Sequence, residues 1–214
     1  MKYQFGLIWS WITIMRVASA ARRLIGLRPG SRPGKNARML CGEMTGLRAR
    51  RDDDIPVLHA ELYDDVETRS MADSRPWQPI PPGSGSPYVV TGTDSRAACF
   101  SAVELATGEL AGEALLWGID LHNRAAHIGI SLRPACRGRG LGVDVVRVLC
   151  RYGFAIRGLH RLQVETVAGN IAMIQAASRA GFTREGTLRR SAWVNGDFTD
   201  EAVLGLLAAE WRAA

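Results

Sequence analysis

A glycine- and arginine-rich segment, "RPACRGRGLG" at residues 133–142, most restricts what this chain can fold into. It holds three glycines and three arginines, between the strand-like alternation of "AAHIGISL" and the helical apolar spacing of "VDVVRVLCRYGF". A strand-to-helix turn of this composition gathers backbone N–H groups, the positive end of a helix and arginines, which favours binding of an anion. A basic surface turn without a ligand is the alternative.

The charge of the chain is concentrated at its N-terminus. Of 214 residues, 47% are hydrophobic, enough for one domain with a sizeable core. Residues 1–44 carry eight Lys and Arg against Glu43 alone, whereas 19 Arg face 20 Asp and Glu in the rest, a net charge of about −1. We predict a basic extension over residues 1–44, outside the core, and one domain over residues 45–214. A nucleic-acid partner is not expected, because a binder would carry the basic surface on its folded domain.

The predicted extension has features of a secretory signal, with an apolar run from Phe5 to Met15 and "ASA" at residues 18–20. The run is too short to span a bilayer. Three interpretations stay open: a disordered or misassigned upstream segment with Met39 or Met44 as the natural start, contact with a membrane surface, and export.

The cysteines indicate a reducing environment. Cys41, Cys99, Cys136 and Cys150 are scattered, with neither a C-x-x-C pair nor a histidine at zinc-ligand spacing. We therefore expect free thiols, no metal site and a cytoplasmic protein.

From residue 45 the periodicity predicts an α+β domain. Alternating stretches predict strands and 3.6-residue periodicity predicts helices, in the order β-α-βββ-α-β-α-ββ. The expected elements are a short strand near residue 45, a helix starting at residues 52–54 with Ile55, Leu58, Leu62 and Val66 on one face, a long loop at 71–88, strands at 97–105, 109–120 and 123–132, a helix at about 140–154, a strand at 161–167, a helix at 170–180 ended by Gly181, and a final hairpin at 182–208.

Two common glycine loops do not match the segment at 133–142. A nucleoside-triphosphate loop needs G-x-x-x-x-G-K-[ST], and the chain has no lysine from residue 45 onward. A dinucleotide loop needs G-x-G-x-x-G, but Val143 stands where the third glycine belongs, and the strands before the loop are predicted to be antiparallel. A shorter R-x-x-G-x-G loop remains, over Arg137 to Gly142, with the same physical basis for holding a phosphate.

The ordered set "HIGISLRPACRGRGLG", "VETVAGN" and "SRAGF" resembles the GCN5-related N-acetyltransferase (GNAT) family, and "SRPWQPIPP" with "VNGDFTDEAVL" resembles its RimJ/RimL branch. The resemblance covers about Leu47 to Leu207 and implies a mixed sheet that splays in the middle to admit the pantetheine arm of acetyl-CoA. It implies that the coenzyme A pyrophosphate is held by Arg137 and the amides of Gly138, Arg139, Gly140, Leu141 and Gly142, and that the backbone of Leu132 pairs with pantetheine. Asn170 matches an asparagine of the family that contacts the cofactor; helix capping is its other interpretation.

The catalytic positions depart from the family pattern. Relatives place a tyrosine seven residues after the asparagine, or a serine three after it, where this chain has Ala177 and Met173. His127 stands where the family often has a glutamate and is our candidate base, although a structural role is the common one for a strand histidine. Glu104, Glu113 and His122 are weaker candidates.

Trp77 lies in "RPWQP" within the long loop, which in the resembling fold overhangs the acetyl end of the cofactor. The indole either covers the acceptor amine or holds the loop to the core.

We therefore predict an N-acetyltransferase that transfers an acetyl group directly from acetyl-CoA to a primary amine of a protein N-terminus or a small molecule, as a monomer or homodimer. A non-catalytic acyl-CoA-binding module, an acyltransferase with a different acyl-CoA and a dinucleotide oxidoreductase are the alternatives.

Overall fold

The computed structural model describes residues 39–72, 75–90, 92 and 96–211. The chain divides into two units, Met1–Ala37 and Arg38–Ala214, and every described residue belongs to the second. Most of the predicted extension lies outside the described residues. Its last part, from residue 39, adds a short strand to the edge of the sheet, where Leu40 and Cys41 pair with Leu47 and Gly46. Within the described part, no helix is long and apolar enough to cross a membrane.

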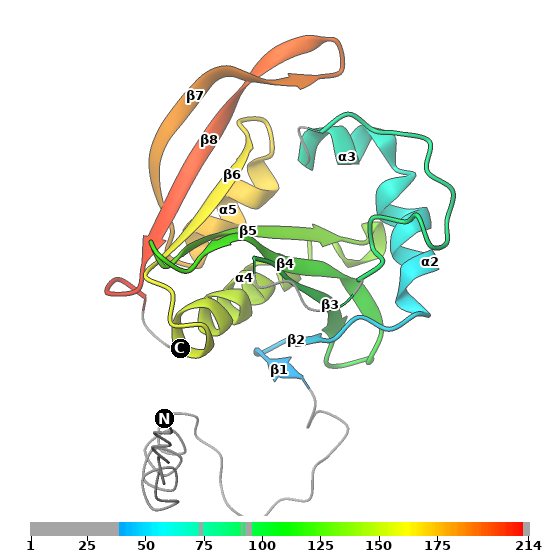
Figure 1. The fold of residues 1–214 in the computed structure, drawn as a ribbon, viewed down its shortest axis with the longest axis horizontal. Helices are drawn as coiled ribbons and strands as arrows, with labels where there is room; N and C mark the ends of the chain where they lie inside the picture. The colour runs from blue at the N-terminus through cyan, green and yellow to red at the C-terminus, as the bar shows by residue number, and fades with distance from the viewer. Residues whose placement is uncertain (1–38, 73–74, 91, 93–95, 212–214) are drawn as a thin grey trace, which may run out of the picture. The chain divides into compact units, whose positions relative to one another are not determined.

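One mixed sheet of eight described strands organises the domain, in the order β1-β2-β3-β4-β5-β6-β8-β7 (Figure 1). The β5–β6 pair is parallel and every other neighbouring pair is antiparallel. The strands are β1 (Leu40–Cys41), β2 (Thr45–Arg48), β3 (Ala98–Glu104), β4 (Leu110–Asp120), β5 (Ala125–Leu132), β6 (Arg161–Val167), β7 (Thr183–Val194) and β8 (Asp197–Leu207).

Helical segments lie on both faces of the sheet. Alternate residues of the central strands, among them Leu116, Ile128 and Leu162, pack with α4 and α5 in the main core. A smaller cluster under the first helices contains Leu58 and Tyr63. The segments are α2 (Asp54–Leu58), the π-helix η1 (His59–Tyr63), α3 (Val66–Ala72), the 3₁₀ turn η2 (Pro134–Cys136), α4 (Leu141–Arg151), the π-helix η3 (Tyr152–Ile156) and α5 (Ile171–Arg179).

The predicted α+β class and order of elements are confirmed, with two local differences. The first predicted helix is divided among α2, η1 and α3, so that Val66 begins a new helix and is 39% exposed instead of buried. The helix expected at 140–154 ends as α4 at Arg151 and continues as the π-helix η3. Gly181, at φ +104°, follows the last turn of α5 as predicted, because its conformation lets the next N–H, that of Phe182, donate back to the carbonyl of Ala177.

A buried ionic network joins β2, α2 and β3 on the face covered by α2. The Arg48 guanidinium contacts both carboxylate oxygens of Asp54, at 2.6 and 2.8 Å. The Ser101 hydroxyl and the Arg51 N–H also donate to that carboxylate. Burial by itself would raise the pKa of Asp54, but these hydrogen bonds outweigh it and lower the pKa to about 2.

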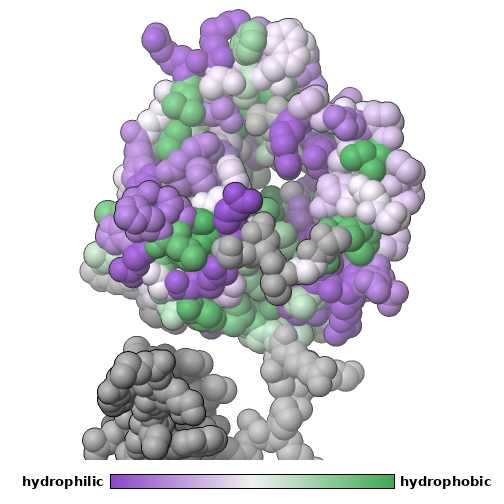
Figure 2. Space-filling model, viewed as in Figure 1, coloured by the Kyte–Doolittle hydropathy of each residue, from purple (hydrophilic) through white to green (hydrophobic). Residues whose placement is uncertain are grey.

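The sheet splays between β5 and β6. These strands pair only at Ala125–Arg161, Ala126–Leu162 and His127–Gln163, after which they diverge. From residue 128 to Leu132, β5 has no described strand partner on the side of β6. Figure 2 shows the surface hollowed between β5, β6 and α3. The fork is therefore an opening in the middle of the sheet, and one of its strands leads directly into the glycine-rich loop.

Candidate functional site: the glycine-rich loop and the fork

The glycine-rich loop forms the turn between β5 and α4. Gly138 and Gly140 have φ angles of +71° and +83°, left-handed conformations that residues with a side chain rarely adopt. Gly140 is the N-cap of α4 and has no side chain to cap the helix. Among the described residues, none accepts a hydrogen bond from the N–H groups of residues 138–142. The loop thus presents a row of free backbone donors at the positive end of a helix, the arrangement that binds phosphate.

Two arginines of the loop contact carboxylates on the segments that follow α2. Arg133 forms a two-point pair with Glu61 of η1, at 2.5 and 2.9 Å, which ties β5 to that helix. Arg137 donates through Nε to the carbonyl of Leu132 at 2.9 Å, and its Nη2 lies 3.7 Å from Asp65 Oδ2. The predicted pyrophosphate ligand Arg137 therefore has one short guanidinium hydrogen bond, to the backbone of Leu132, and one distant ionic partner, Asp65.

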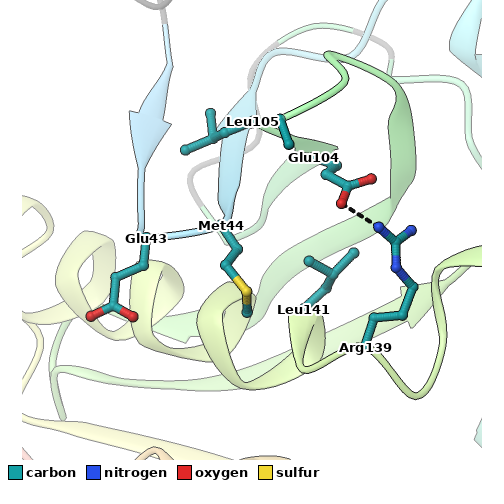
Figure 3. A pocket seen from close by; sticks show the side chains of 7 residues that line it. Glu43, Met44, Glu104, Leu105, Arg139 and Leu141 are labelled. Carbon is teal, nitrogen blue, oxygen red and sulfur yellow. Dashed lines mark hydrogen bonds and ion pairs between the residues drawn. The ribbon is translucent and has the colours of Figure 1, made fainter.

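The third loop arginine, Arg139, pairs with a carboxylate of β3. Its guanidinium contacts Glu104 at the end of β3, across a pocket of about 470 Å³ (Figure 3). Met44, Leu105, Ala106 and Leu141 form the apolar part of the lining. Arg139 was predicted to contribute its backbone amide to the cofactor site, and its side chain is engaged in this pocket.

Asn170 is the N-cap of α5. Its Oδ1 accepts from the Met173 N–H at 3.2 Å, and its Nδ2 donates to Thr166 Oγ1 at 3.0 Å. The capping interpretation therefore holds in this structure, and the predicted contact with the cofactor stays a prediction. Ala177 is fully buried in the core and Met173 packs against it, so neither position offers a proton donor to the fork.

His127 lies at the closed end of the fork, as the last residue of β5 that pairs with β6. Its ring stacks on Trp117 of β4, with centroids 4.3 Å apart and planes 23° from parallel. Its Nδ1 is 4.0 Å from Glu165 Oε1 on the diverging part of β6. Burial lowers the pKa of His127; Glu165 opposes this shift and Arg161 adds to it. The imidazole is therefore mostly neutral at pH 7 and chemically able to accept a proton.

The weaker candidates lie in other environments. Glu113 pairs with Arg50 at 2.9 Å, and burial raises the pKa of this carboxyl group against the opposing effect of the arginine. Glu104 pairs with Arg139. His122 is exposed in the turn between β4 and β5.

Trp77 is anchored to the first helical region. Its indole N–H donates to the carbonyl of Tyr63 at 3.1 Å, and the two rings lie 6.2 Å apart. The side chain is still 37% exposed. This contact supports the interpretation that Trp77 holds its loop, while contact with an acceptor stays a prediction.

Three residues of the site region were missed by sequence reasoning. Trp117 is the register partner of His127 on β4, and Glu165 lies two residues beyond Gln163, the register partner of His127 on β6. Asp144, in the first turn of α4, binds the turn before β2. The alternation of "RLQVETV" placed Glu165 on one face of its strand with Gln163, but nothing local indicated which strand that face would meet.

The splayed sheet with the glycine-rich loop at the end of one of its diverging strands matches the fold expected from the motifs, and comparison with known proteins identifies the family. A family model, the acetyltransferase (GNAT) domain, matches residues 45–183. The chain therefore belongs to the GNAT family, which confirms the family predicted from the motifs.

Individual relatives match in part. "Probable N-acetyltransferase YjcK" of Bacillus subtilis is 32% identical over 39% of this chain and 46% of its own length. Spermidine N(1)-acetyltransferase of Escherichia coli K12 is 30% identical over 42% of this chain and 49% of its own length. The chain thus spans about half the length of these curated relatives.

Solved structures share the fold. Spermidine N-acetyltransferase from Vibrio cholerae, in complex with CoA and spermine, is 20% identical with a TM-score of 0.67, over 78% of this chain and 98% of that chain. RimJ of Mycobacterium smegmatis, in complex with CoA-disulfide, is 21% identical with a TM-score of 0.61, over 81% of this chain and 86% of that chain.

Proposed function

We propose that the protein is an N-acetyltransferase that moves the acetyl group of acetyl-CoA directly to a primary amine. The observation that carries the proposal is the continuity of the fork with the loop. The edge of β5 that lacks a described strand partner leads to the N–H groups of residues 138–142, which have no acceptor among the described residues. A pantetheine chain lying along β5 would place its pyrophosphate on those amides, and its thioester would then lie toward the closed end of the fork.

The pyrophosphate would engage the amides of residues 138–142 and the guanidinium of Arg137. In doing so, Arg137 would exchange its distant partner Asp65, at 3.7 Å, for a phosphate oxygen. Its bond to the carbonyl of Leu132 occupies one group that the resemblance assigned to pantetheine, so this bond would also be exchanged if Leu132 pairs with the cofactor.

In the transfer step, the neutral amine nitrogen attacks the thioester carbonyl carbon, the N–C bond forms and the C–S bond breaks. His127 accepts the proton that the nitrogen loses, directly or through water, and coenzyme A leaves as a thiolate that takes a proton from solvent. The remaining rate acceleration comes from positioning of the amine against the thioester, because Met173 and Ala177 cannot act as acids.

The acceptor is a protein N-terminus or a small-molecule amine. One curated relative is named for spermidine, and one solved neighbour was determined with spermine. The hollow between β5, β6 and α3 is the entrance through which such an amine would reach the fork.

A thiol-release assay with acetyl-CoA and a panel of amines tests the proposal. The panel contains spermidine, aminoglycosides and short peptides with free N-termini, and CoA binding is measured in parallel by calorimetry. Release of free thiol with at least one amine is expected. Binding of CoA without release for any amine would support the non-catalytic binding module, and binding of NAD(P) without CoA binding would overturn the loop assignment.

A further inference from the structure

A row of polar side chains on β6 leads to His127. Arg161 forms a two-point pair with Glu185 of β7 and donates to the Gln163 amide oxygen at 2.8 Å. The Gln163 amide nitrogen donates to Glu165 Oε1 at 2.5 Å. Arg161, Gln163 and Glu165 alternate along one strand, so their side chains share the face of the sheet opposite the main core.

His127 meets the end of this row across the fork. Its Nδ1 is buried, has no hydrogen-bond partner among the described residues and lies 4.0 Å from Glu165 Oε1. On its other side the ring is stacked on Trp117, which limits its rotation. A buried imidazole nitrogen without a partner costs free energy, and here the Glu165 carboxylate lies about 1 Å beyond hydrogen-bond distance.

We propose that Glu165 is a positioning residue, held by Gln163, that keeps the proton of neutral His127 on Nδ1 and thereby leaves the Nε2 lone pair to receive the proton of the acceptor amine. The role of Nε2 as proton acceptor rests on the proposed function. The tautomer of His127 does not depend on it. A small rotation of the Glu165 side chain, which is 32% exposed, closes the gap to Nδ1.

The physical basis is that the hydrogen bond made by one imidazole nitrogen decides where the ring carries its proton. A carboxylate can only accept, so it selects the tautomer with hydrogen on Nδ1. The groups that face His127 are Trp117 from β4 and Glu165 and Arg161 from β6. Glu165 also stabilises the imidazolium formed when the proton is taken up, while Arg161 opposes it through charge.

The test uses the full-length protein with Glu165→Gln, Glu165→Asp and the matched control Asp197→Asn, which removes an exposed carboxylate at the tip of the β7–β8 hairpin. NMR of the imidazole nitrogens, with His127→Gln to assign the signal, reports the tautomer without any need for turnover. We expect hydrogen on Nδ1 in the wild type and the control, partial retention in Glu165→Asp and a shift toward hydrogen on Nε2 in Glu165→Gln.

Kinetics provide the second measurement. In Glu165→Gln, kcat should fall at least about tenfold with KM for acetyl-CoA unchanged, because a misoriented base loses part of its contribution. The acid limb of kcat/KM should move to lower pH, because the carboxylate that raised the pKa of His127 is gone. An unchanged tautomer in Glu165→Gln would overturn the positioning role. If the variants show the predicted tautomers but the protein turns over no amine, the positioning role of Glu165 stands, and the result counts against the proposed function.

Discussion

Asp144 connects the helix that begins at the glycine-rich loop to the turn before β2. Asp144 is 4% exposed, and its carboxylate accepts from the N–H groups of Glu43, Met44 and Thr45, at 3.0, 3.0 and 2.7 Å, and from the Thr45 hydroxyl at 2.6 Å. The approach is close: a Cβ added to Gly42 would lie 2.5 Å from the carboxylate oxygens. We therefore expect Asp144→Asn to destabilise the domain strongly.

The size of this destabilisation depends on which hydrogen bonds of the Asp144 carboxylate an asparagine amide can still make. The asparagine oxygen can take the place of Oδ2 and its three donors, but its NH₂ group then faces the Glu43 N–H, where Oδ1 had accepted. One charge-assisted bond worth about 1.5–3 kcal/mol is lost, and the favourable charge at the helix N-terminus, about 0.3–1 kcal/mol, is removed. The expected loss in the free energy of unfolding is about 3 kcal/mol, which lowers the urea midpoint by about 1.5 M for a slope of about 2 kcal/mol/M.

Urea unfolding of the full-length protein, followed by circular dichroism, measures this loss, and Asp197→Asn should stay within about 0.5 kcal/mol of the wild type. Burial alone would raise the pKa of Asp144, but the bonds from Thr45, Glu43 and Met44 outweigh it and lower the pKa below its usual 3.8. The difference between wild type and Asp144→Asn should therefore persist from pH 7 down to about 3.8 and disappear as the pH falls further. A loss below about 0.5 kcal/mol at pH 7 would refute the assignment of Asp144 as the link.

Other predictions concern the ionic network, the loop and the acceptor. Because the pKa of Asp54 is lowered to about 2, the wild type should lose roughly 2 kcal/mol more stability than Asp54→Asn between pH 3.8 and 2 in acid-unfolding curves. Arg137→Ala should weaken CoA binding in calorimetry by about 1.5–3 kcal/mol, and an unchanged Kd would show that its guanidinium does not reach phosphate. Glu104→Gln should tighten CoA binding, because Arg139 would be released from its carboxylate and a negative charge near the loop removed; weaker binding would contradict this. Trp77→Ala should raise KM for the amine about tenfold, about 1.4 kcal/mol, if the indole covers the acceptor, whereas a lower melting temperature with unchanged KM would leave it only the loop-anchoring role.

The conformation of the glycine-rich loop was predictable because its signals are local. The loop from Arg137 to Gly142 carries its own conformational requirements, since glycines permit left-handed backbone and a following apolar period starts a helix. The order of strands and helices was predictable for the same reason. The contacts of the loop's arginine side chains were not predictable. Their partners Glu61, Asp65 and Glu104 come from segments far away in the chain.

The sequence by itself therefore determined the class of fold, the glycine loop and the family, through periodicity and spacing within short windows. Only the tertiary structure decided where β5 and β6 separate, directly after His127, and that Glu165 and Trp117 flank this histidine. It also decided that Asp144 binds the turn before β2. Each of these contacts depends on the register and packing of elements distant in sequence, and a shift by one residue would turn a strand side chain to the opposite face of the sheet.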